Sequence, residues 1–158
     1  MFDKIIARLT RMLKMDHTVY DEVAVDEDAT VEAAIIVAIA ALLTALGSLF
    51  GGSFLDFVAT FFRQILVGWA LWSLIVWLVG SKLFAGNGTF LNVLRVLGYV
   101  TAPLILGIIP VVGGLVGGIL SLVLAFFAIR ETMDLTTERT ILTIIIGWVI
   151  NLVLSVVF

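Results

Sequence analysis

Five long apolar stretches fill this chain of 158 residues from Ala33 to its last residue. They cover residues 33–50, 65–80, 93–109, 113–129 and 141–158, each close to the roughly 20 residues that cross a hydrocarbon core of about 30 Å. A backbone in lipid must satisfy its own hydrogen bonds, and these runs lack the period-two alternation of barrel strands. The sequence therefore predicts an all-α integral membrane protein with a bundle of five transmembrane helices.

The positions of the basic residues predict the orientation, because Lys and Arg are retained on the cytoplasmic side of a membrane. With the N-terminus inside, the cytoplasmic segments hold eight of the nine basic residues: Lys4, Arg8, Arg11, Lys14, Lys82, Arg95, Arg130 and Arg139. The outer segments hold only Arg63. We therefore expect a cytoplasmic N-terminus and an outer C-terminus, with Phe158 at the far interface.

Composition argues against several functions. The net charge is −3, which disfavours nucleic acid as a partner. The chain has no cysteine, so disulfides, cysteine-bound zinc and thiol catalysis are excluded. Its one histidine, His17, has no His or Cys companion, and we assign it no metal. No cofactor motif and no nucleophile with a neighbouring base is evident, so the sequence predicts no catalytic residue and no enzyme.

The first 32 residues form a cytoplasmic segment of two parts. Residues 2–14 predict a basic amphipathic helix, with apolar residues at helical spacing on one face and Lys4, Arg8, Arg11 and Lys14 on the other. We expect this helix to lie on the anionic inner leaflet of the bilayer; the alternative is that it packs against the ends of the bundle. Residues 16–32 are an acidic stretch, either solvated or available to a basic partner.

Small residues in the first and fourth spans predict close helix packing, because they let helix backbones approach one another in lipid. The fourth span has two overlapping registers and the first span has one; the positions are Gly113, Gly114, Gly117, Gly118 and Ser121, and Ala34, Ala38, Ala41 and Ala45. We favour packing within one bundle over a homodimer contact, and in either case a central fourth helix.

The third span is interrupted by Pro103, which removes a hydrogen-bond donor and predicts a kink. Broken helices can mark a transport site, so a small transporter or channel subunit built around Pro103 and Asn151 is an alternative function. However, no ionisable residue lies in the middle of any span, and such residues usually mark ion coupling.

The sequence Gly98-Tyr99, followed by Pro103, resembles the Gly-Tyr-xxx-Pro motif of the Yip family, whose members are named for interaction with Ypt/Rab GTPases. The segment from Ala128 through the predicted cytoplasmic loop, with Arg130, Asp134, Glu138 and Arg139, is similar to prokaryotic members. The chain lacks the Asp-Leu-Trp/Tyr-Gly-Pro type of segment that precedes the first span in eukaryotic relatives.

This resemblance implies a multi-pass protein that organises membranes or partners without performing chemistry. The expected location is a prokaryotic plasma membrane. The expected partners are the lipid bilayer and a second copy of the chain or another membrane protein. A basic amphipathic helix attached to five spans with little outer mass gives a separate physical reason to expect an effect on curvature, because more area would enter the inner leaflet.

Overall fold

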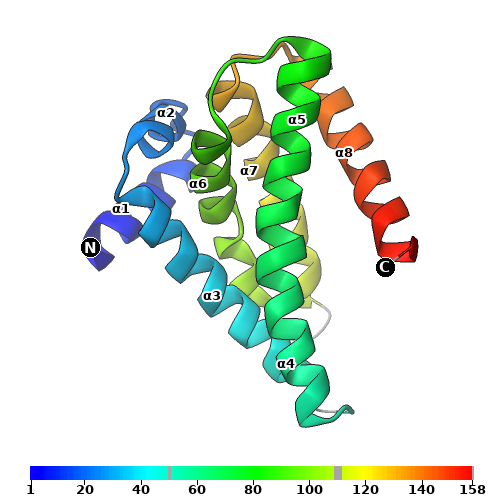
Figure 1. Ribbon diagram of the computed structural model, residues 1–158. Coiled ribbons are helices and arrows are strands. Elements are labelled where there is room, and N and C mark those ends of the chain that lie inside the picture. Colours follow the sequence, from blue (N-terminus) through cyan, green and yellow to red (C-terminus); the bar gives the residue numbers. More distant parts are fainter. Residues whose placement is uncertain (50, 109–111, 158) are drawn as a thin grey trace.

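The computed structural model describes residues 1–49, 51–108 and 112–157, and within these residues every regular element is a helix. The predicted span ends Phe50, Ile109 and Phe158 lie outside them. Along the chain the elements are α1 (Phe2–Leu13), α2 (Thr18–Val25), α3 (Ala29–Ser48), α4 (Phe54–Arg63), the π-helix η1 (Gln64–Leu71), α5 (Trp72–Phe84), α6 (Phe90–Val100), the 3₁₀-helix η2 (Ala102–Ile108), α7 (Val112–Thr132) and α8 (Thr137–Val157). Figure 1 shows α1 and α2 beside the start of α3.

The predicted all-α fold is confirmed, with four helices in the described part of the chain that are long and apolar enough to cross a membrane. They are Ala29–Gly47, Phe54–Phe84, Val112–Thr132 and Thr137–Leu154. The region of the predicted third span, Phe90–Leu106, is shorter and less regular. The count of five spans and the orientation of the termini therefore stay predictions.

The second membrane-length helix is continuous from α4 through η1 to α5 and contains 31 residues. At 1.5 Å per residue it is about 46 Å long. It begins at a capping box, in which Ser53 Oγ accepts from the Asp56 amide and the Asp56 carboxylate accepts from the Ser53 amide at 2.6 Å. The predicted span 65–80 is the inner part of this helix, because a hydropathy pattern does not detect the polar cap that starts it.

The predicted break in the third span is confirmed. Helix α6 begins at the N-cap Thr89, whose hydroxyl accepts from the Asn92 amide, and it ends at Val100. Pro103 has no N–H to donate to the carbonyl of Tyr99, so the α-helical ladder cannot continue through it. The chain proceeds as the 3₁₀-helix η2, which is tighter and normally short.

Helix α7 packs mainly on this broken span, along η2 and α6, whereas α8 lies at the edge of the bundle and packs mainly on α5 (Figure 1). Gly117 permits the closest approach: a Cβ atom there would lie 2.5 Å from the carbonyl oxygen of Pro103. Steric contact of this kind between backbones requires glycine. The contact therefore fixes α7 against the break in the third span.

The C-terminal ends of α5 and α7 and the start of α8 meet at one end of the bundle (the top in Figure 1). These helix ends carry Lys82, Arg130 and Arg139, and we call this end the basic end. Two contacts join separate loops and helices at this end. The Asn87 amide, between α5 and α6, donates to the Met133 carbonyl, just after α7, at 2.8 Å. His17 Nδ1, just before α2, lies 3.2 Å from a carboxylate oxygen of Glu131 on α7. Large side chains are fully buried in this region, including Met12, Tyr20, Tyr99 and Met133. The N-terminal helices are therefore an integral part of the packed bundle.

Candidate functional site at the basic end

Helix α1 is docked on the bundle by one side and exposed on the other. Ile5 and Met12 are buried on the docked side, and Arg8 lies between them with only 3% of its surface exposed. On the other side, Phe2, Ile6 and Leu13 are each more than half exposed. The apolar face of the helix is thus divided between the protein core and the surroundings.

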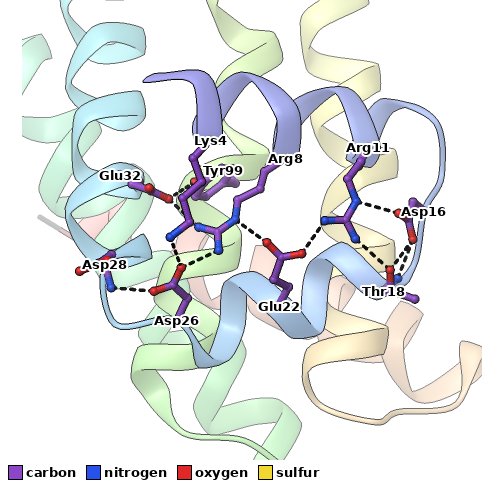
Figure 2. A network of polar contacts seen from close by, with 10 residues as sticks. All are labelled: Lys4, Arg8, Arg11, Asp16, Thr18, Glu22, Asp26, Asp28, Glu32 and Tyr99. Carbon is purple, nitrogen blue, oxygen red and sulfur yellow. Dashed lines mark hydrogen bonds and ion pairs between the residues drawn. The ribbon is translucent and has the colours of Figure 1, made fainter. Parts of the chain in front are cut away.

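The buried Arg8 guanidinium binds three carboxylates (Figure 2). Its Nη1 donates to Glu32 at 2.6 Å, its Nη2 to Asp26 at 2.5 Å and its Nε to Glu22 at 3.0 Å. Glu32 is equally buried and also accepts a hydrogen bond from the Tyr99 hydroxyl. This chain of contacts joins α1, α2, the first turn of α3 and the tyrosine of the Gly-Tyr-xxx-Pro motif in α6.

Further pairs surround this centre at the surface. Lys4 lies 2.6 Å from the same Asp26 oxygen, and Arg11 binds both Glu22 and Asp16 (Figure 2). These outer pairs are partly exposed, and water and salt screen such pairs so that they contribute little to stability. The pair of Arg8 and Glu32 is different, because both groups have left water and each depends on the other for compensation.

A second buried arginine was not singled out from the sequence. Arg95 on α6 donates through Nε to the Thr30 hydroxyl at 2.7 Å and through Nη1 to the Ala24 carbonyl at 2.9 Å. It therefore ties α6 to the end of α2 and the start of α3. Its signal in the sequence is a cation inside an apolar run, where a buried partner is expected.

Acid should weaken the docking of α1. Hydrogen bonds from Lys4 and then Arg8 lower the pKa of Asp26 to about 2, whereas an unfolded Asp titrates near 3.9. Because the carboxyl pKa is lower in the docked state than in the unfolded state, ionised Asp26 stabilises docking at pH values above the unfolded pKa. This stabilisation is lost as the pH falls through the pKa of the docked state. The variant Ala7→Cys gives this chain a single thiol, to which a fluorescent dye can be attached. We expect the fluorescence anisotropy of this dye to stay constant from pH 7 to about 5 and to fall between about pH 4 and 2. Unchanged anisotropy down to pH 2 would contradict this.

The three motif residues all lie at contacts between helices. A Cβ atom on Gly98 would lie 2.5 Å from Cβ of Ala33 and 3.0 Å from Nε1 of Trp69. Trp69 Nε1 itself donates to the Leu94 carbonyl at 2.9 Å. With Tyr99 bonded to Glu32 and the Pro103 carbonyl against Gly117, the motif connects α6 and η2 to α1, α3, η1 and α7.

The four residues of the predicted cytoplasmic loop do not converge on one site. Arg139 donates to the Phe84 carbonyl at 3.3 Å, Arg130 lies 3.4 Å from the Glu131 carboxylate, Asp134 has a positive φ of 51°, and Glu138 is exposed in the first turn of α8. Nearby on α2, burial first and then the charges of Glu131 and Asp134 raise the pKa of Asp21. Helix α2 packs on α7 beside this loop.

The prediction that Arg8 lies on a lipid surface is corrected by its burial. The helical pattern identified a basic face, but the acidic stretch folds back onto that face and binds Arg8 in place of lipid headgroups. Lys4 and Arg11 are also ion-paired there, although both remain partly exposed. Lys14 is exposed. A lipid-surface role for Lys4, Arg11 and Lys14 stays a prediction.

The predicted small-residue positions fall into two groups. Gly113, Gly117, Ala41 and Ala45 are buried, whereas Ala38, Gly118 and Ser121 are partly buried and Ala34 and Gly114 are exposed. The inward register on α7 contacts the broken third span, and α3 packs mainly on α4, α6 and η2. A role for the outward positions in self-association stays a prediction.

The carboxylates of this site serve as partners for cations. Within the described residues, no group of three or more His, Asp or Glu side chains is placed to hold a metal ion. Glu22, Asp26 and Glu32 are all engaged by arginine or lysine. The arrangement can hold α1 in place, and its strength depends on the ionisation of these groups.

The helical bundle and its long apolar helices define a multi-pass membrane protein. A family model described as the Yip1 domain matches residues 16–158. The chain belongs to this family, as the motif of Gly98, Tyr99 and Pro103 predicts. No curated protein and no solved structure matches it. Helix α1 precedes the matched residues, so Arg8 links a segment outside the match to a motif tyrosine inside it.

Proposed function

We propose that this protein is a non-enzymatic organiser of a prokaryotic plasma membrane, with its basic end in the cytoplasm and α1 acting on the inner leaflet. The observation that carries the proposal is the two-sided placement of α1. Its buried Arg8 fixes it to the bundle, and its exposed Phe2, Ile6 and Leu13 form an apolar stripe. A rigidly held helix of this kind adds area to one leaflet, which favours curvature.

Self-association or a membrane partner would then concentrate the effect. The exposed apolar surface of α8 and the outward register of Gly114 on α7 are available for such contacts within the bilayer. Anionic lipid in the inner leaflet would attract the exposed Lys14 and the partly exposed Lys4 and Arg11.

Electron cryomicroscopy of proteoliposomes tests direct shaping. We expect vesicles to become smaller or tubular as the protein-to-lipid ratio rises. The triple variant Phe2→Ser, Ile6→Ser, Leu13→Ser should largely lose this effect, because it removes the exposed stripe and leaves Arg8 and Met12 in place. A matched control, Phe2→Leu with Ile6→Leu, should retain it. Vesicles that stay unchanged with the wild-type protein would exclude direct shaping and favour partner scaffolding, to be examined by crosslinking in native membranes.

A small transporter or channel subunit is the second candidate. It is favoured by a hollow of about 280 Å³ beside the broken third span, lined in part by Thr101, Leu104, Ser121 and Asn151. Solute flux through the same proteoliposomes, with unchanged vesicle shape, would support this candidate over membrane shaping.

A further inference from the structure

Two neighbouring hollows, which we together call the groove, are lined by residues of α4, η1, α5, α6, η2, α7 and α8. The first hollow, of about 280 Å³, is bounded mostly by apolar side chains, including Trp72, Leu122 and Ile144. The second, of about 340 Å³, is lined by Thr60, Arg63, Gln64 and Val67. Gly68 and Asn151 line both hollows, so the two hollows lie side by side at this point. The groove is polar at one end and apolar along the other.

Several polar side chains that line this groove lack partners. In the described part of the chain, the side chains of Arg63, Gln64 and Asn151 make no hydrogen bond or ion pair. The Ser121 hydroxyl is buried and also has no partner. Unpaired polar groups are costly in a lipid environment. Their convergence indicates a groove built for an occupant with polar atoms.

The charge of this groove suits an anionic phospholipid. Arg63 is the basic residue among the side chains that line the two hollows. It lies in the more polar hollow with Thr60 and Gln64, whereas the other hollow is mostly apolar. A cation beside an apolar hollow matches a molecule that joins an anionic group to an acyl chain.

We propose that this groove binds one anionic phospholipid. The phosphate pairs with the Arg63 guanidinium, and the amides of Gln64 and Asn151 satisfy the ester region. One acyl chain occupies the apolar hollow toward Trp72. This assignment rests on the groove alone and is independent of the proposed membrane shaping.

The tryptophans provide the probe. Trp69, Trp72 and Trp148 line the groove, and Trp77, the fourth tryptophan of the chain, is bonded to the Gly88 carbonyl near the basic end. The full chain is reconstituted in phosphatidylcholine vesicles with increasing fractions of brominated phosphatidylglycerol or brominated phosphatidylcholine, whose bromines quench tryptophan fluorescence. We expect half-quenching at a roughly fivefold lower fraction of the anionic lipid, since one cation near the membrane surface contributes about that preference.

Two sets of variants separate headgroup from acyl chain. Arg63→Ala should abolish the preference for the anionic lipid and Arg63→Lys should keep most of it, whereas Lys82→Ala, at the basic end, should leave it unchanged. Gly118→Leu places a side chain in the groove and should weaken quenching by both lipids. Gly114→Leu is its control, because neither glycine has a neighbour within 4 Å of an added Cβ and Gly114 does not line the groove. Equal quenching by the two lipids in the wild-type protein, or an anionic preference that survives Arg63→Ala, would overturn the proposal.

Discussion

Replacing Arg8 with methionine is expected to release α1 from the bundle. In this variant Glu32 would remain buried, and of its two hydrogen-bond partners, Arg8 and Tyr99, only the Tyr99 hydroxyl would remain. Breaking one member of a buried ion pair typically costs about 3–5 kcal/mol, because the remaining charge is uncompensated. We therefore expect the amides of α1 to lose most of their protection in hydrogen exchange followed by mass spectrometry, while the amides of α5 and α7 keep theirs.

Two comparisons make this result specific. Arg11→Met removes a cation from the same helix but at a partly exposed position, so it should leave most of the protection of α1 in place. The double variant Arg8→Met, Glu32→Gln removes both buried charges and should recover part of the lost protection. If Arg8→Met leaves the exchange of α1 unchanged, the network does not hold the helix.

Replacing Gly117 with alanine is the second change with a large expected effect. The new Cβ would lie 2.5 Å from the Pro103 carbonyl oxygen and 3.2 Å from its carbon. Backbone atoms cannot rotate away as a side chain can, so α7 must move away from η2. Overpacking of this kind typically costs about 1–3 kcal/mol, and we expect a lower midpoint of thermal unfolding in detergent, followed by circular dichroism.

Gly114→Ala is the matched control, because it lies on the same helix and an added Cβ there has no neighbour within 4 Å. Alanine is favoured over glycine in a helix by up to about 1 kcal/mol. The control should therefore be neutral or slightly stabilising. Equal unfolding midpoints for the two variants would show that the contact between Gly117 and Pro103 does not limit the packing of α7.

Hydropathy was sufficient to predict the membrane-spanning character of the helices, and the position of Pro103 was sufficient to predict the break in the third span. Both features follow from local chemistry. Hydropathy was not sufficient to locate the start of the second long helix at the Ser53 cap. The segment before Arg63 is amphipathic and shorter than a span. It continues into η1 and α5, and no proline interrupts residues 54–84.

The contacts of the N-terminal charges could not be predicted from local sequence patterns. Helical periodicity established that Lys4, Arg8 and Arg11 share a face, but it cannot say whether that face meets lipid or protein. The answer depends on the turn after α1, which brings Glu22 and Asp26 back along the helix. Glu32, in the first turn of a membrane-length helix, was the available signal, because a carboxylate there requires a nearby partner.

The order of synthesis places a condition on when the N-terminal segment can become fixed. Glu32 and Tyr99 are separated by 67 residues, and the contacts of Arg95 with Ala24 and Thr30 span similar intervals. At about 5–20 residues per second, α6 emerges roughly 3–13 seconds after Glu32. During that interval α1 can pair with α2 but cannot be anchored to the motif tyrosine. Completion of the network therefore reports that the third apolar segment has been inserted, which makes it a late step of assembly.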